Sequence, residues 1–120
     1  MSTTYLILLP GDEKRWADVS DAERADVYAA HGRFSAGLAE RGHTVVGGAE
    51  LAPSGGARTV RPGADGPVVS EGPYAETTEQ LTGFYLVETD DLDDLLQVCG
   101  ILTEVGDALE VRECLAMDGA

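Results

Sequence analysis

His31 is the first residue of this 120-residue chain that could carry chemistry, because an imidazole titrates near neutral pH and can move protons. It falls on one helical stripe with Val27, Phe34, Leu38 and Arg41, so it is predicted to face the interior of the domain. A histidine in such a stripe can equally be a structural residue that bonds a backbone carbonyl. The spacing leaves both interpretations open.

The loop EGPYAET, residues 71–77, is the second candidate. Glu71 and Glu76 could act as acid, base or hydrogen-bond acceptor, and Tyr74 could place a hydroxyl at the rim of a cavity. The alternative is a tight turn set by the Gly-Pro pair, in which Glu76 or Thr77 caps a short helical segment.

Two aromatic residues, Tyr5 and Trp16, are candidates for lining a substrate pocket, although aromatics in a small domain usually fill the core. His43 follows a helix-ending glycine and is interpreted as a turn residue. The chain contains no phosphate loop, nucleophile elbow, zinc helix or dinucleotide fingerprint. Neither the two cysteines nor the two histidines have metal-ligand spacing, so we expect no metal or cofactor and two buried thiols in a reducing compartment.

The elements that must position these residues form one domain, residues 1–120. We expect strands at 4–9, 43–51, 81–88 and 108–114, helices at 21–41 and 89–104, and short strands at 58–62 and 67–70 that form a hairpin. This order predicts an α+β sandwich with both helices on one sheet face, that is, a ferredoxin-like βαββαβ core with an inserted hairpin. The other face needs a cover, and we expect a homodimer to provide it.

Capping signals fix the helix starts. Ser20 stands three residues before Glu23, which is the spacing of a capping box, and Thr89 or Asp90 is a good N-cap for the second helix. The segment before the first helix, residues 12–19, is interpreted as a charged connection. The predicted buried stripe of the second helix is Leu92, Leu95, Leu96, Cys99 and Leu102.

The net charge of −14, from 22 acidic and 8 basic residues, limits the classes of molecule that the protein can bind. Neutralising several phosphates requires lysines and arginines, so direct binding to nucleic acid or to an anionic membrane is disfavoured. No apolar run has the length of a membrane span, and the first residues do not form a signal peptide. These features favour the cytoplasm, with a basic protein as a possible partner.

Several of these segments together resemble the YCII-related family, in particular its DGPF-domain branch. The segments are YLILLPGDE, HGRFSAGLAERG, VGGAELAP, EGPYAETTEQLTGFYL, DDLDDL and LEVREC, which span nearly the whole chain. The resemblance implies a ferredoxin-like fold, a dimer, and a site in a cleft toward which a helix histidine points. Some relatives are lyase-type enzymes on small aromatic or oxygenated compounds, in which that histidine, sometimes with an aspartate, is the acid and base. His31 occupies that position.

The chain departs from the family pattern at three places. The first loop acid is Glu71 rather than Asp, the loop aromatic is Tyr74 rather than Phe, and the segment GILTE stands where the partner aspartate is expected. Glu104, Asp107 or a loop glutamate could substitute for that aspartate.

Two functions follow as hypotheses. The first is a small cytoplasmic dimeric enzyme without a cofactor, of lyase, isomerase or dehydratase type, acting on a small organic molecule, with secondary metabolism as a candidate setting. His31 and Glu76 would be catalytic, and Glu71, Tyr74, Tyr5 and Trp16 would bind substrate. The second is a non-catalytic module that binds a ligand or a protein, such as a transcription regulator, with His31 held structurally.

Overall fold

A four-stranded antiparallel sheet is the centre of the computed structural model, which describes residues 2–106 and 108–116. Strands β1 (Thr3–Asp12) and β5 (Glu79–Thr89) pair along their whole length in its middle. At the edges, β6 (Glu110–Glu113) pairs with β1 and β2 (Thr44–Glu50) pairs with β5, which gives the order β2-β5-β1-β6. This order confirms the ferredoxin-like α+β prediction.

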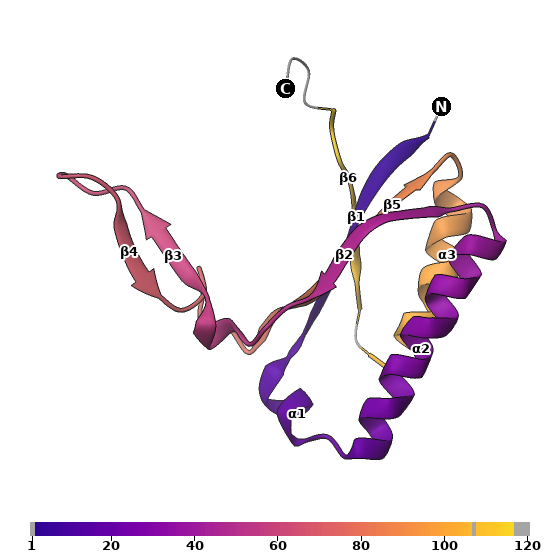
Figure 1. The fold of residues 1–120 in the computed structure, drawn as a ribbon, viewed down its shortest axis with the longest axis horizontal. Coiled ribbons are helices and arrows are strands. Elements are labelled where there is room, and N and C mark those ends of the chain that lie inside the picture. The colour runs from indigo at the N-terminus through magenta and orange to yellow at the C-terminus, as the bar shows by residue number, and fades with distance from the viewer. Residues whose placement is uncertain (1, 107, 117–120) are drawn as a thin grey trace.

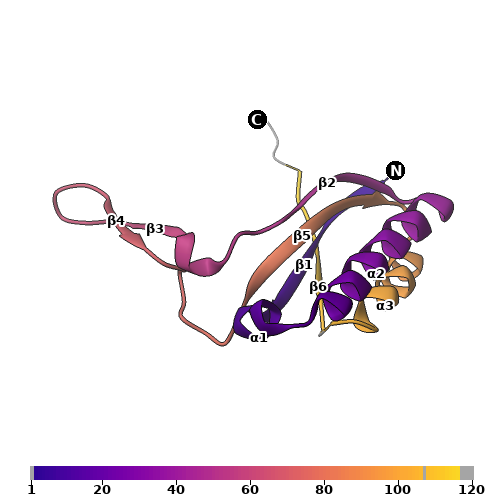
Figure 2. The ribbon, with the colours of Figure 1, turned by 60° about the horizontal axis from the view of Figure 1, so that its bottom comes forward.

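Two long helices lie side by side on one face of this sheet (Figures 1 and 2). Helix α2 (Asp21–Glu40) joins β1 to β2, and α3 (Leu92–Thr103) joins β5 to β6. Ser20 caps α2 as predicted, because its hydroxyl accepts the Glu23 amide at 3.1 Å. The core between helices and sheet consists of Ile7, Phe34, Leu38, Val87, Leu95, Val98, Cys99 and Leu102.

An inserted hairpin projects from the sheet as an arm, residues 51–78, and confirms the predicted hairpin (Figure 1). It contains the turn η1 (Ser54–Gly56) and the two-stranded sheet of β3 (Arg58–Arg61) and β4 (Val68–Glu71), which pair only with each other. The arm enlarges the molecule: the radius of gyration is 16.7 Å, against about 14 Å for an average 120-residue domain.

Several local predictions are corrected. The charged connection contains a short helix, α1 (Glu13–Asp18), because Asp12 accepts the amides of Lys14 and Arg15. Asp91, rather than Thr89 or Asp90, caps α3. The α3 stripe is rotated, so that Val98 is buried while Leu92 and Leu96 are more than a third exposed. On α2, Arg41 is exposed, since it ends the helix instead of joining the buried stripe.

Candidate functional site: a histidine–tyrosine pair beneath helix α2

His31 pairs with Tyr85 between α2 and the sheet. Its Nδ1 lies 2.7 Å from the Tyr85 hydroxyl oxygen, and the two rings are nearly parallel at 5.8 Å. Phe34 packs against the Tyr85 ring, with the two ring centroids 5.0 Å apart. Whichever residue carries the shared proton, Nδ1 is occupied, and Nε2 is the nitrogen left for a substrate.

Partial burial shifts the pKa of each residue of the pair in the direction that favours its neutral form. Desolvation lowers the pKa of His31, and the negative charge of Glu50 partly opposes this. Desolvation raises the pKa of Tyr85, and the nearby Ser35 hydroxyl partly offsets it. At neutral pH the pair is therefore an uncharged imidazole beside a protonated phenol, which is a competent proton donor and acceptor set.

Glu50 reaches this side of the sheet because of a β-bulge in β2. Val45 lies opposite Val87 on the helix face, but the register shifts before Gly47, and Glu50 then lies opposite Gly83 on the same helix face. Gly48 lies opposite Tyr85 at φ +155, where a Cβ would stand 2.7 Å from the Phe84 carbonyl oxygen. The bulge and its glycine thus place a carboxylate near His31.

An aromatic rim lies at the α1 end of the same side. The Tyr28 hydroxyl donates to both carboxylate oxygens of Glu50 at 3.2 Å, and Trp16 meets Tyr28 edge to face at 5.8 Å. The Arg24 guanidinium stacks 4.5 Å above Trp16 and donates to the Trp16 carbonyl at 3.0 Å. Trp16, predicted to bind substrate, is therefore linked through Tyr28 and Glu50 to the surroundings of His31.

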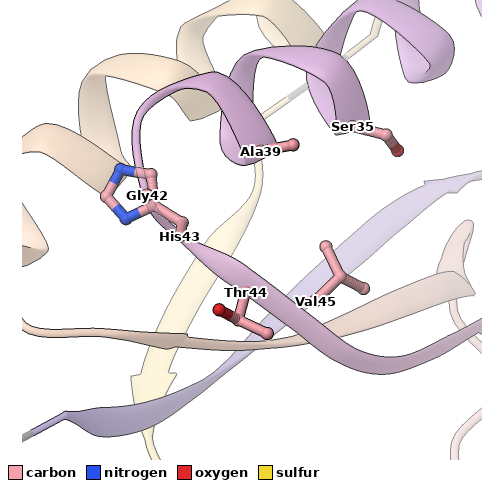
Figure 3. Close-up of a pocket in the computed structure, with 6 residues that line it drawn as sticks. All are labelled: Ser35, Ala39, Gly42, His43, Thr44 and Val45. Carbon is pink, nitrogen blue, oxygen red and sulfur yellow. The ribbon is translucent and has the colours of Figure 1, made fainter.

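A depression of about 540 Å³ opens between α2 and β2 (Figure 3). Ser35, Ala39 and Val45 point toward it, while the His43 ring lies apart from them on the side of α3. Ser35 also neighbours the Tyr85 hydroxyl. The depression is lined by Ser35, Ala39, Gly42, His43, Thr44 and Val45. Neither His31 nor Tyr85 lines it, and Ser35 is its one link to that pair.

The predicted loop residues lie elsewhere. Glu71 and Glu76 line a second, polar depression of about 610 Å³, together with Asp12, Glu13, Lys14, Ser54, Gly55, Gly72, Pro73, Thr77, Thr78 and Gln80. His31 does not line it. Tyr74 is 85% exposed, and Tyr5 packs against the core from β1.

The loop itself is organised as an anchor for the arm. The Gln80 amide donates to the carbonyl oxygens of Ala75 and Thr77, and the Gly72 amide donates to the Ala57 carbonyl at 2.8 Å. No helical segment occurs between β4 and β5, so the expected helical cap is absent from these described residues. The turn interpretation of the loop holds without that helix.

His43 has a structural role that the sequence interpretation missed. It is 5% exposed, its Nε2 donates to Asp94 at 2.7 Å, and its Nδ1 lies 2.7 Å from the Thr89 hydroxyl. Arg41 also binds Asp94 through two nitrogens. Arg41 first, and then His43, hold the pKa of Asp94 well below its usual value. The cluster ties the α2–β2 turn to the start of α3.

Glu104, one of the proposed substitutes for the missing aspartate, pairs with Arg33 rather than with His31. Glu104 is exposed and lies 3.8 Å from Arg33, and Asp107 lies outside the described residues. Glu50 is the carboxylate whose charge acts on the imidazole.

Across the described residues, no group of three or more histidines, cysteines or acids is placed to hold a metal ion. Among those same residues, none of the helices is both long and apolar enough to cross a membrane.

Together, the sheet order and the half-buried His31–Tyr85 pair define a small ferredoxin-like α+β domain with a polar pair under one helix. A family model described as the YCII-related domain matches residues 3–117, so the chain belongs to the YCII-related family. The chain is also similar to an uncharacterized protein of Rhizobium meliloti (strain 1021), with 48% identity over 48 residues. That alignment covers 40% of this chain and 39% of the relative, so the chain matches well under half of that protein's length.

Proposed function

We propose that this protein uses His31 as a general acid and base on a small organic molecule, without a cofactor. The reaction class is a lyase, isomerase or dehydratase step, in which one proton leaves a carbon or oxygen atom and another is delivered. The observation that carries this proposal is the 2.7 Å contact between His31 Nδ1 and the Tyr85 hydroxyl, which orients the ring and leaves Nε2 for substrate.

Electrostatics support these roles. A neutral imidazole can accept a proton at neutral pH, and Tyr85 orients that imidazole in the way that a third group orients the histidine of a catalytic triad. Glu50 would stabilise the imidazolium formed after proton abstraction, because its charge favours the protonated ring. Trp16 and Tyr28 would hold the substrate by ring contacts at the rim.

The loop residues have a different part in this proposal. Glu71, Glu76 and Tyr74 lie around the second depression or in solvent, so a direct role requires the substrate to extend past α1, whose Asp12–Lys14 end lines that depression. We keep Glu76 as a second proton-transfer candidate on these terms.

We further propose that the protein is a cytoplasmic homodimer of the DGPF-domain branch. Free thiols at Cys99 and Cys114 support a reducing compartment. The sheet face opposite the helices supports dimerisation: Leu6, Leu8, Phe84 and Leu86 lie on it only half-buried, and no described helix covers it.

The test uses Trp16 as the reporter, since it is the only tryptophan of the chain. Its fluorescence is titrated with small hydroxylated aromatics such as catechol, and the compounds that bind are then assayed for elimination and isomerisation. For a compound that reacts, His31→Gln should lower the rate of elimination or isomerisation by about 10²–10⁴-fold. Arg33→Gln, on the solvent side of α2, is the matched control and should leave the rate unchanged. Equal rates for wild type and His31→Gln would contradict acid–base catalysis and favour the non-catalytic module.

A further inference from the structure

Helix α1 contributes nothing to the buried core, so polar contacts decide where it lies. It has six residues, and none of them is buried. A helix of this length is not stable in isolation, because the cost of nucleation exceeds what its few hydrogen bonds return. Asp12 caps the first turn, but a cap within the same segment does not fix the helix against the rest of the domain. Two of its side chains, Glu13 and Trp16, make the contacts that do.

Glu13 ties α1 to the base of the arm. Its carboxylate accepts a hydrogen bond from the backbone amide of Ser54 at 2.6 Å and a second one from the Ser54 hydroxyl. Both residues are half-buried, and 41 positions separate them in the chain. Hydrogen bonds to an ionised carboxylate are the stronger kind, and two donors on one carboxylate also fix its direction. We call this contact the Glu13–Ser54 latch.

The arm side of the latch is held by the loop that carries the EGPYAET motif. The Gly72 amide of this loop donates to the Ala57 carbonyl at 2.8 Å, and the Gly72 carbonyl accepts the Thr59 hydroxyl at 2.8 Å. These two bonds close the arm directly after the turn η1, on which Ser54 lies. Ser54 therefore presents its amide and hydroxyl to Glu13 from a turn that is held on both sides.

The other end of α1 reaches the surroundings of His31. Trp16 stands three residues after Glu13, so the two side chains share one side of the helix. Trp16 meets Tyr28 edge to face at 5.8 Å, and the Tyr28 hydroxyl donates to Glu50 at 3.2 Å. Glu50 is the carboxylate whose charge acts on the His31 ring. A continuous line of contacts therefore joins the base of the arm to the acid near His31.

We propose that Glu13 and Ser54 are positioning residues for the substrate, because their latch holds α1 with Trp16 at the rim of the site. This inference rests on the proposed function, in which Trp16 contacts the substrate ring. It gives the EGPYAET loop an indirect part, since the loop holds the turn that holds α1. A helix that is fixed before the substrate arrives does not have to be ordered on binding, so the latch raises the affinity for the substrate.

Ser54→Ala tests the latch from outside α1, since the Ser54 hydroxyl bonds α1 only through Glu13. Acrylamide quenching of Trp16, the single tryptophan, is measured in the full chain. Ser54→Ala should increase the quenching, and Ser54→Thr, which keeps the hydroxyl, should restore the wild-type value. Ser70→Ala, the same change at an exposed position of the arm, is the matched control. Glu13→Gln should act like Ser54→Ala, and the double variant should change quenching by less than the sum of the two.

Ligand affinity tests the positioning role. The dissociation constant for catechol, measured by calorimetry, should rise about tenfold in Ser54→Ala, which corresponds to one hydrogen bond to a charged group. Far-UV circular dichroism checks that the variant is folded. For a compound that reacts, Ser54→Ala should raise KM and leave kcat unchanged, whereas His31→Gln should lower kcat.

The outcomes separate the latch from the acid–base chemistry. Unchanged quenching in Ser54→Ala and Glu13→Gln, or an equal rise in Ser70→Ala, would overturn the latch. Increased quenching with unchanged catechol affinity would overturn the positioning role. A wild-type protein that does not bind catechol would contradict the substrate rim and this inference with it. Failure of His31 as acid and base would show separately, as equal rates for wild type and His31→Gln.

Discussion

His31 lies on α2 and His43 lies in the turn that follows this helix, and the surroundings of the two histidines differ. His43 is nearly fully buried, and both of its ring nitrogens lie at hydrogen-bond distance from Thr89 or Asp94. His31 is only half-buried, and Tyr85 engages one of its nitrogens. A ring with both nitrogens bonded supports the fold, whereas a ring with one open nitrogen can exchange protons with a ligand.

The partners of the two rings also differ in kind. The acid at His43, Asp94, is itself held by Arg41, so its charge is balanced locally. The acid near His31, Glu50, is held by the neutral hydroxyl of Tyr28. An ion cluster locks an interface in place, while a carboxylate bonded by a phenol keeps its charge available to a nearby imidazole.

The largest predicted effect separates the two histidines by stability. His43→Ala should lower the free energy of unfolding by about 3 kcal/mol, because it leaves a buried cavity and removes two hydrogen bonds. His31→Ala should cost about 1 kcal/mol, since it removes one hydrogen bond of a half-buried ring. Urea unfolding of both variants measures this difference. Equal losses of unfolding free energy in the two variants would contradict the difference in role between His43 and His31.

A second prediction disturbs only the His31 side. Gly48→Ala should destabilise the protein by about 1–3 kcal/mol, because a Cβ at φ +155 meets the Phe84 carbonyl. Gly32→Ala is the control, since its Cβ on α2 meets nothing within 4 Å and alanine favours a helix. In NMR spectra, Gly48→Ala should shift the His31 ring signals and leave those of His43 in place. A stabilised Gly48→Ala protein would contradict the bulge geometry.

The third prediction concerns acid stability and belongs to the His43 side. The pKa of Asp94 is held below its ordinary 3.8, so the native state binds protons less readily than the unfolded chain. The resulting stabilisation is present above about pH 4 and is lost as the pH falls through and below that range. Asp94→Asn should therefore be less stable than wild type at pH 7 and less sensitive to acid.

Urea midpoints measured from neutral to acidic pH give this dependence. Asp93→Asn, on the exposed neighbouring position, is the matched control and should keep the wild-type acid response. An acid response in Asp94→Asn that is as steep as in wild type would assign the effect to other carboxylates.

The smallest prediction concerns Glu50. Because its charge raises the pKa of His31, Glu50→Gln should lower that pKa further below 6.5. An NMR titration of the two imidazoles measures it, with His31→Gln for assignment, and Glu104→Gln serves as the control for an exposed α3 acid. An unchanged or raised His31 pKa in Glu50→Gln would show that Glu50 does not act on this ring.

Much of the fold could be predicted from the sequence because its signals are local. Apolar runs, the Ser20 cap and the Gly/Pro turns gave the element order, and the order of strands and helices then implied the sheet. The α1 helix was missed because six residues carry too weak a periodicity, and Asp12 reveals it only once its side chain is seen to cap the turn.

The site was predictable in part. The helical stripe predicted that His31 faces the interior, and Tyr85 could have been added, since it shares the parity of the buried Val87 on β5. Glu50 could not, because alternation from Val45 places it on the opposite face and only the bulge reverses that parity. The partners of His43 lie 46 and 51 residues away in the chain, beyond any local pattern.

The central claim is that His31 is the reactive histidine and His43 a structural one. Acylation by diethyl pyrocarbonate, followed site by site with mass spectrometry, tests it directly because the reagent attacks an accessible, neutral imidazole nitrogen. The account predicts rapid acylation of His31, with a rate that rises with pH to a midpoint below 6.5, and protection of His43 until the protein unfolds. Rapid acylation of His43 in the folded protein, or an inert His31, would contradict it.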